Sequence, residues 1–370
     1  MHIAIIGAGH AGVEAALYAR KAGAEVTLFS AEPVLPYFRP RLVSLAFGHV
    51  ELDAILMHPA AWYETQGIRL RLNSPVTAFD PATRRITTAD GAGTFDAVVI
   101  ASGANPVKPP LPTAPAGLPI LSLWSAADAA VIRAQVKPGR RLTVLGGGIL
   151  GIETALNAHE AGLSVTVIER MERLMPLQFA PEGSALLHRL LTGLGITVRM
   201  GVTTTGAGLD GDFVVLAIGS RPDLAIASAA GLATSRGTRV DERLQTAVSG
   251  VFAAGDTAEL SSPFRSSARE AGAQGRQAGA NAAAAAAGLP LQPYVTTLLP
   301  LLFKSGPVDL ASEGLAWDPD CVVKRLDEGL GPDQYRALII KNGLLAGVQA
   351  IGTRKEFDGW TQCIGDPVTP

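Results

Sequence analysis

The sequence GAGHAG at residues 7–12 is matched by GGGILG at residues 146–151. Both have the pattern G-x-G-x-x-G, and each lies between an apolar run and an alanine-rich stretch. Glycines at these positions let backbone N–H groups approach a pyrophosphate, and the helix that follows points its positive end at the charge. One such turn is a weak signal, because it also serves as a tight joint between a strand and a helix. Two of them in one chain predict two bound dinucleotides.

The two halves of the sequence repeat each other beyond these turns. Each half is predicted to contain a strand, a helix and a second strand, at His2–Ile6, Val13–Ala22 and Glu25–Phe29, and again at Leu142–Leu145, Ile152–Ala161 and Ser164–Ile168. Later segments, DAVVIASGANP (96–106) and FVVLAIGSRPD (213–223), also correspond. Continuous runs of Val and Ile are typical of buried parallel strands. The repeat predicts an α/β fold with two Rossmann-like dinucleotide-binding domains.

The halves differ in length, and other segments surround them. From Gly7 to Gly103 is 96 residues and from Gly146 to Gly219 is 73, and much of the extra chain is expected around VLPYFRPRLVSLAFG (34–48). The proline-rich stretch 106–119 is interpreted as the crossing between domains. After the second half we predict a returning strand, a long alanine-rich helix and a small α+β C-terminal domain, at Val251–Ala254, Ser267–Ala287 and 291–370.

Composition excludes several classes of function. The 31 basic and 33 acidic residues leave a net charge of −2, which gives no electrostatic footprint for nucleic acid. Two cysteines exclude a disulfide scaffold and fit a reducing compartment. The apolar N-terminus leads into the glycine turn without a basic region or a cleavage site, and no run of about 18 apolar residues occurs. We therefore expect a soluble, cytoplasmic protein that does not bind a membrane.

The residue type after each second strand indicates how a ribose is held. Glu169 lies 23 residues after Gly146 and ends the run VTVIE. A carboxylate there accepts hydrogen bonds from both ribose hydroxyls and repels a 2′-phosphate, so NADH is favoured over NADPH. Arg170 and Arg173 could weaken that preference, and Glu169 could instead be a solvated strand end. In the first half the equivalent residue is the uncharged Ser30, so either Glu32 reaches the ribose or this ribose is held more weakly.

These motifs resemble the flavoprotein pyridine-nucleotide oxidoreductases with two dinucleotide domains, and more narrowly the NADH:rubredoxin and flavorubredoxin reductases. The most specific stretch, AEPVLPYFRPRL (31–42), is similar to a family segment in which an acid is followed by Pro-Tyr-x-Arg-Pro. A second stretch, VFAAGDTAEL (251–260), is similar to the family's Gly-Asp segment. The resemblance covers nearly the whole chain and assigns the first glycine turn to FAD and the second to NADH.

The resemblance also implies roles for individual residues. Glu32 would hold the adenosine ribose of FAD, Arg39 would lie by the pyrophosphate and flavin, and Asp256 would bind the ribityl chain. His10 would line the FAD site without catalysing. Judged from the residues alone, Asp256 could be a helix N-cap and Arg39 an ordinary solvent-exposed arginine. The residues expected at FAD are Gly7, Gly9, His10, Gly12, Glu32, Arg39, Ala101, Ser102, Gly103 and Asp256, and those expected at NADH are Gly146, Gly148, Ile149, Gly151, Glu169 and Gly219.

The family pattern implies a discontinuous FAD-binding domain. It would consist of residues 1–108 and 238–290, with the NAD(P)H-binding domain inserted at 109–237 and the C-terminal domain at 291–370.

Hydride transfer requires the nicotinamide C4 to lie against the flavin N5. It also requires positive potential near the flavin N1–C2=O edge, which stabilises the reduced anion. The helix that begins near Ser267 could supply that potential from its N-terminus. Lys304 is a second candidate for the source of this positive potential. The resemblance aligns it with a Phe-Trp-Ser-Asp segment that lies beside the flavin in related ferredoxin reductases. Glu153 matches a family acid near the nicotinamide. Lys304 could also be a surface lysine, and Glu153 an ordinary helix glutamate. The six histidines have no metal-ligand spacing, so no metal is expected.

The positions of the cysteines decide the expected route of the electrons. Disulfide reductases of this fold carry C-x-x-x-x-C after the first unit, and the NADH oxidases and peroxidases carry a single cysteine there. This chain has Leu-Val-Ser-Leu-Ala at 42–46, and its only cysteines, Cys321 and Cys363, are most simply small core residues. Electrons should therefore leave the flavin directly.

The predicted function is an FAD enzyme that takes hydride from NADH and reduces a small electron-carrier protein, rubredoxin or similar. Two alternatives stay open. One is an NADH oxidase that reduces oxygen directly, and the other is a flavin-binding redox-sensing or interaction protein. No motif identifies the acceptor, and a monomer and a homodimer are equally expected.

Overall fold

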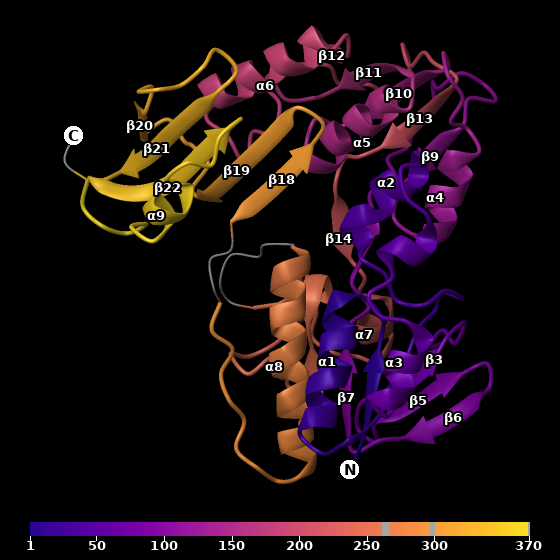
Figure 1. The fold of residues 1–370 in the computed structure, drawn as a ribbon. Helices are drawn as coiled ribbons and strands as arrows, with labels where there is room; N and C mark the ends of the chain where they lie inside the picture. The colour runs from indigo at the N-terminus through magenta and orange to yellow at the C-terminus, as the bar shows by residue number, and fades with distance from the viewer. Residues whose placement is uncertain (261–266, 297–299, 369–370) are drawn as a thin grey trace. The chain divides into compact units, whose positions relative to one another are not determined.

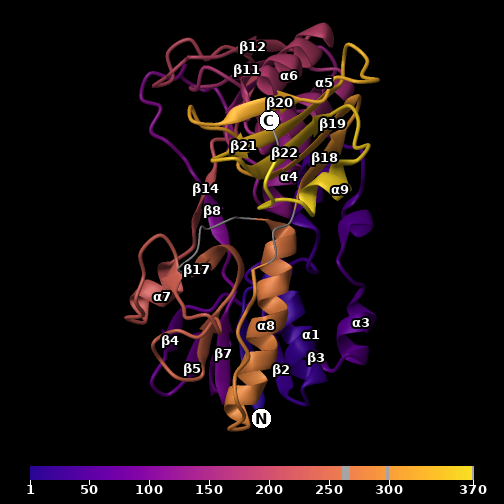
Figure 2. The same cartoon turned by 90° about the vertical axis from the view of Figure 1, so that its left-hand side faces the viewer.

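The computed structural model describes residues 1–260, 267–296 and 300–368. Contacts divide the chain into two compact units (Figures 1 and 2). Unit one consists of 1–42, 50–105 and 220–297, and unit two of 43–49, 106–219 and 298–370.

Unit one is built on a five-stranded parallel sheet. Its order is β16-β7-β1-β2-β3. The strands are β1 (His2–Ile6), β2 (Glu25–Phe29), β3 (Ile68–Arg71), β7 (Ala97–Ile100) and β16 (Val251–Ala253). The central strands are apolar and almost fully buried, which is the pattern of a parallel sheet covered on both faces.

Helices α1 (His10–Lys21) and α8 (Ala268–Ala286) lie side by side in both views of unit one (Figures 1 and 2). Small residues make this close packing possible. A Cβ atom at Gly275 would lie 2.2 Å from the carbonyl oxygen of Ala11, and one at Gly279 would lie 2.1 Å from that of Ala15. A larger side chain at either glycine would push the two helices apart.

Shorter elements complete unit one. They are η1 (Arg39–Arg41), η2 (Leu52–Ile55), α3 (Ala60–Thr65), the antiparallel strands β4 (Ala78–Asp80), β5 (Arg85–Thr88) and β6 (Gly91–Thr94), α7 (Ala225–Ala229), β15 (Thr238–Arg239), η3 (Gly255–Thr257) and β17 (Ala258–Glu259). Strands β8 (Ala104–Pro106) and β14 (Ser220–Pro222) pair with each other.

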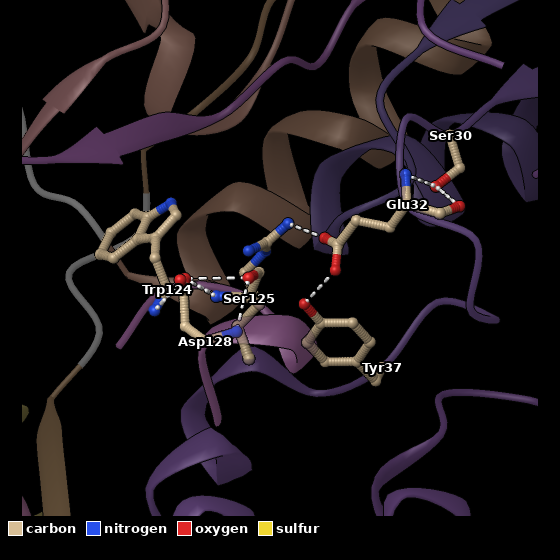
Figure 3. A network of polar contacts seen from close by, with 7 residues as sticks. Ser30, Glu32, Tyr37, Trp124, Ser125 and Asp128 are labelled. Carbon is tan, nitrogen blue, oxygen red and sulfur yellow. Dashed lines mark hydrogen bonds and ion pairs between the residues drawn. The ribbon is translucent and has the colours of Figure 1, made fainter. Parts of the chain in front are cut away.

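Unit two repeats the parallel sheet in the order β12-β11-β10-β13-β9. Its strands are β9 (Ile120–Ser122), β10 (Arg141–Leu145), β11 (Ser164–Ile168), β12 (Thr197–Arg199) and β13 (Phe213–Leu216), and its helices are α2 (Leu42–Ala46, from Val43 onward), α4 (Ala126–Arg133), α5 (Ile149–Glu160) and α6 (Pro181–Gly193). Ser125 and Asp128 form a capping box at the start of α4 (Figure 3). The two parallel sheets differ in one edge strand. In unit one this strand is β16, which follows the other four strands in the chain, and in unit two it is β9, which precedes them.

A second, antiparallel sheet in unit two has the order β18-β19-β22-β21-β20. It contains β18 (Leu301–Ser305), β19 (Val308–Gly314), β20 (Val322–Arg325), β21 (Tyr335–Lys341) and β22 (Leu344–Ile351), and α9 (Phe357–Thr361) follows it. Polar contacts join this sheet to the segment that precedes α6. The amide of Ala180 donates to Oε1 of Gln349 at 2.9 Å, and the Ser312 hydroxyl donates to the Gln178 carbonyl at 2.7 Å.

The predicted α/β fold with two Rossmann-like sheets is confirmed, and the strands predicted at 2–6, 25–29 and 164–168 have the observed bounds. Both dinucleotide helices begin three residues earlier than predicted, at His10 and Ile149. The reason is that Gly9 and Gly148 are the N-caps, so helical hydrogen bonds start inside the glycine turn. Strands β4–β6 account for part of the extra length in the first half, besides residues 34–48.

The predicted domain bounds stay a prediction. In the structure, contacts group residues 220–237 with unit one and 298–370 with unit two. No helix in the described part of the chain is both long enough and apolar enough to cross a membrane.

Candidate dinucleotide sites

The first glycine turn follows β1 and leads into α1. A Cβ atom at Gly7, where φ is +103°, would lie 2.3 Å from the Ala101 carbonyl oxygen, and one at Gly12 would lie 1.8 Å from the Gly7 carbonyl oxygen. A Cβ atom at Gly9 would meet nothing within 4 Å. Packing therefore demands the first and third glycines, whereas the second faces open space. That open space is where a pyrophosphate approaches the backbone in this motif.

The second glycine turn, between β10 and α5, has the same geometry. A Cβ atom at Gly146 would lie 2.4 Å from the Ala217 carbonyl oxygen, and one at Gly151 would lie 1.9 Å from the Gly146 carbonyl oxygen. Gly148 faces open space as Gly9 does. Gly103 and Gly219 each come two residues after Ala101 and Ala217, which directly follow β7 and β13, and both glycines have positive φ and open surroundings. The two turns are therefore equivalent cradles that side chains would fill.

The first turns of α1 and α5 contain no acidic residue, so no carboxylate there opposes the positive end of either helix. His10 is the first residue of α1, as Ile149 is of α5. Burial, with a smaller contribution from the charge of Arg39, lowers the pKa of His10 to about 4. His10 is therefore neutral at pH 7, and its ring lies 5.6 Å from that of Phe38.

Glu32 has both carboxylate oxygens engaged. The Tyr37 hydroxyl donates to Oε2 at 2.7 Å, and Arg39 forms an ion pair with Oε1 at 2.8 Å. Figure 3 shows the Tyr37 hydroxyl directed at the Glu32 carboxylate, and the Ser30 hydroxyl bonds to the Glu32 backbone. Two residues of the Pro-Tyr-Phe-Arg segment thus orient the carboxylate. Arg39 is half exposed but is tied to Glu32 rather than directed only at solvent.

A cavity of about 440 Å³ opens beside Gly7 in unit one. Phe29 and Ala31, at and after the end of β2, line it together with residues 74–77 and Ser102. The cavity lies at the carboxyl end of the parallel strands, where ligands bind in open α/β sheets.

Ser102 joins a cluster that the sequence did not reveal. Its hydroxyl donates to the Asp223 carbonyl at 2.9 Å, as does the hydroxyl of the fully buried Thr257, also at 2.9 Å. The Asp223 amide donates to the Gly103 carbonyl at 2.8 Å. Three segments far apart in the chain thus meet at one end of the sheet. Asp223 and Thr257 are polar residues beside predicted turns, which was the only signal that could have found them.

Asp256 lies in η3, directly after β16. It is not the N-cap of the long helix, because Ser267 caps α8 and accepts a hydrogen bond from the Glu270 amide at 3.1 Å. Gly255 has φ of +76°, and a Cβ atom there would lie 2.9 Å from the Cβ of Ala11. The Gly255–Asp256 turn therefore lies against the first turn of α1, next to the glycine cradle.

In unit two, the Glu169 carboxylate accepts hydrogen bonds from two backbone amides, one of them in the second glycine turn. Its Oε2 accepts from the Gly147 amide at 2.5 Å and its Oε1 accepts from the Met171 amide at 2.7 Å. Arg170 is exposed. The Arg173 guanidinium carbon lies 4.6 Å from the centre of the Trp317 ring, and Arg173 also donates to the Pro176 carbonyl at 3.4 Å.

The two predicted catalytic residues have different surroundings. Glu153 is half buried in α5, and desolvation raises its pKa to about 7. Lys304 is exposed on β18, opposite Asp309 in the strand register. Their roles remain predictions.

Both cysteines are distant in sequence from α2. Residues 42–46 form α2 without a cysteine, and Cys321 and Cys363 are both free thiols. Cys363 packs at the edge of the apolar cluster around Phe357. Among the residues that the structure describes, no group of three or more His, Cys, Asp or Glu side chains could hold a metal ion.

Comparison with known proteins agrees with this geometry. Residues 1–287 match the family model described as pyridine nucleotide-disulphide oxidoreductase. The ferredoxin–NAD(+) reductase component of the anthranilate 1,2-dioxygenase system of Burkholderia cepacia is 35% identical over 68% of this chain. The match spans 66% of that relative's own length, just under two thirds.

Two further proteins support the same branch. The NADH-rubredoxin oxidoreductase of Clostridium acetobutylicum is 31% identical over 76% of this chain and 74% of its own length. The crystal structure of a covalent putidaredoxin reductase–putidaredoxin complex matches with a TM-score of 0.86 at 26% identity, over 99% of this chain and 93% of the matched chain. The predicted resemblance to the pyridine-nucleotide oxidoreductases, and more narrowly to the NADH:rubredoxin reductases, is confirmed.

Two equivalent glycine cradles, each on a five-stranded parallel sheet, thus occur in a chain that matches one family model over most of its length. This chain belongs to the pyridine nucleotide-disulphide oxidoreductase family.

Proposed function

We propose that this protein is an FAD-dependent reductase that passes electrons from NADH to a small electron-carrier protein of the rubredoxin or ferredoxin kind. The observation that carries the proposal is the duplicated cradle, in which Gly9 and Gly148 face open space while the flanking glycines are closely packed. Two such cradles in one chain suit two redox dinucleotides that exchange electrons.

The first cradle fits FAD. Gly9 leaves room for the pyrophosphate, and Glu32, oriented by Tyr37 and Arg39, would hold the adenosine ribose. Unit one also has the Gly255–Asp256 turn against α1, so a carboxylate is available for the ribityl chain, which FAD has and NADH lacks. The cavity beside Gly7 offers space for part of the cofactor.

The second cradle fits NADH. Glu169 directly follows β11 and is held by two backbone amides, so it would present a fixed carboxylate to the ribose hydroxyls. Arg173 stacks on Trp317, which keeps one of the two nearby cations occupied. Both features favour NADH over NADPH.

Two observations support a carrier protein as the electron acceptor: α2 contains no cysteine, and the relatives are named for carrier proteins. When bound, FAD takes a hydride from NADH and releases electrons one at a time, as single-electron carrier proteins require. Helix α2 offers no cysteine to relay electrons. Relatives named for ferredoxin, rubredoxin and putidaredoxin support a carrier of this kind. Two free cysteines fit a reducing compartment such as the cytoplasm.

The first experiment is an absorbance scan of the purified protein, followed by an anaerobic titration with NADH. We expect flavin bands that bleach with one equivalent of NADH. A colourless protein that takes up no FAD on reconstitution refutes the proposal.

Steady-state turnover then separates the acceptors. We expect NADH consumption with added rubredoxin or a small ferredoxin to exceed consumption with oxygen alone by at least tenfold. Equal rates with and without the carrier would favour an NADH oxidase. Slow turnover with every acceptor would favour a redox-sensing protein.

A further inference from the structure

A buried chain of hydrogen bonds connects Tyr294 to the Gly255–Asp256 turn. The Tyr294 hydroxyl donates to Oε1 of Glu270 at 2.7 Å, and the Gln274 side-chain amide donates to the same oxygen at 3.2 Å. Oε1 of Gln274 in turn accepts from the Gly255 amide at 2.9 Å. Glu270 is 8% exposed and Gln274 6% exposed, so the chain runs through the interior of unit one.

The chain has a defined direction. A carboxylate only accepts hydrogen bonds, so it fixes the Gln274 amide with its NH₂ group toward Glu270. The carbonyl oxygen of Gln274 must then face Gly255, the group to which the Gly255 N–H donates. The Tyr294 hydroxyl supplies a further donor to the same carboxylate oxygen. Each buried polar group is thus satisfied by the next, which is the condition under which such a network orders its surroundings.

The far end of the network lies on the segment that follows α8. The Tyr294 amide donates to the Glu242 carbonyl at 2.7 Å, and the Gln292 amide donates to Oδ1 of Asn281 at 2.9 Å. These bonds hold Tyr294 against α8. The near end lies at a glycine in the left-handed region, where packing against Ala11 leaves little space for displacement.

We propose that Tyr294, Glu270 and Gln274 are positioning residues that hold the Gly255–Asp256 turn in the conformation that binds FAD. The inference rests on the proposed function. None of the three needs to touch the cofactor, because their effect passes through the Gly255 amide to the next residue, Asp256. Loss of the acceptor would leave a buried N–H without a partner and would release the turn.

Gln274→Leu is the direct test, because it keeps the side-chain volume and removes the acceptor. We expect the dissociation constant of FAD to rise roughly ten- to a hundredfold, and the visible circular dichroism of the bound flavin to change. Gln277→Leu is the matched control on the same helix. Gln277 bonds to Asn281 and to the Gln292 carbonyl and not to Gly255. Asn281 still holds the Gln292 amide and carbonyl when Gln277 is replaced, so the FAD affinity of this variant should stay within about twofold of wild type.

Tyr294→Phe removes only the terminal hydroxyl and serves if the leucine variant does not fold. It should raise the FAD dissociation constant severalfold while the unfolding midpoint of the apoprotein matches that of Gln277→Leu. Wild-type FAD affinity and flavin spectrum in both Gln274→Leu and Tyr294→Phe overturn the inference. If the wild-type protein itself binds no FAD, the proposed function fails instead, so the two failures are distinguishable.

Discussion

Glu153 makes the stability of this protein depend on pH in an unusual direction. Burial in α5 raises its pKa from the ordinary 4.5 to about 7. Between these two values the unfolded chain releases the proton while the folded protein keeps it. The folded state is therefore least penalised below pH 4.5, and it loses stability as the pH rises toward 7. Each unit of pKa shift corresponds to about 1.4 kcal/mol, so the full penalty above pH 7 is about 3 kcal/mol.

Glu153→Gln removes this penalty, because the amide is neutral at every pH. The variant should equal wild type near pH 4.5 and exceed it by up to about 3 kcal/mol above pH 7.5. We expect a difference in unfolding midpoint on the order of 5–10 °C at pH 8, measured by thermal denaturation of the purified protein from pH 5 to pH 8.5.

Glu160→Gln is the control, because Glu160 is exposed on the same helix. Its difference from wild type should be small and independent of pH. A Glu153→Gln variant whose midpoint runs parallel to wild type across the range, or falls below it at pH 8, would refute the reasoning.

Four further predictions concern the cradles and their acids. Gly9→Ala should fold with a wild-type unfolding midpoint but lose FAD, because its Cβ atom meets no protein atom and fills the open space instead; retention of flavin colour would contradict this. Gly148→Ala should keep FAD and raise the KM for NADH at least tenfold, and an unchanged KM in steady-state assays would count against the second cradle. Glu169→Ala should raise the KM for NADH roughly tenfold and narrow the preference over NADPH, whereas an unaltered NADH/NADPH ratio would remove Glu169 from the ribose site. Tyr37→Phe should weaken FAD binding severalfold in fluorescence titrations by releasing one oxygen of Glu32, and wild-type affinity would show that Arg39 alone suffices.

Much of the fold could be predicted because its signals are local. A short motif specifies the φ angles and close approaches of each glycine turn. Strands β1, β2 and β11 have the predicted bounds, and β10 begins one residue earlier than predicted. The sequence predicts the starts of α1 and α5 three residues too late, because Gly9 and Gly148 cap these helices without a polar side chain that would mark the cap. The antiparallel strands β4–β6 are short and mostly exposed, and nothing in their composition distinguishes them from loops.

The contacts of the candidate sites were less predictable, because they join residues that are remote in the sequence. Ser102 and Asp223 are 121 positions apart, and Gly255 and Gln274 are 19 apart. Neither Glu270 nor Gln274 stands out in an alanine-rich helix. Their importance depends on burial beside a left-handed glycine, which no local pattern records.

The amino-acid sequence alone determined that two glycine turns of the same kind exist and that Glu169 follows the second, because backbone conformation and steric access at a glycine turn depend on neighbouring residues. The tertiary structure decided the pKa of Glu153 and the orientation of the Glu32 carboxylate. Glu153 looks like any helix glutamate until surrounding elements exclude water from it, and Glu32 acquires a fixed orientation only when Tyr37 and Arg39 fold back onto it. Desolvation and hydrogen-bond geometry are properties of packed neighbours, so they arise only when the chain has folded.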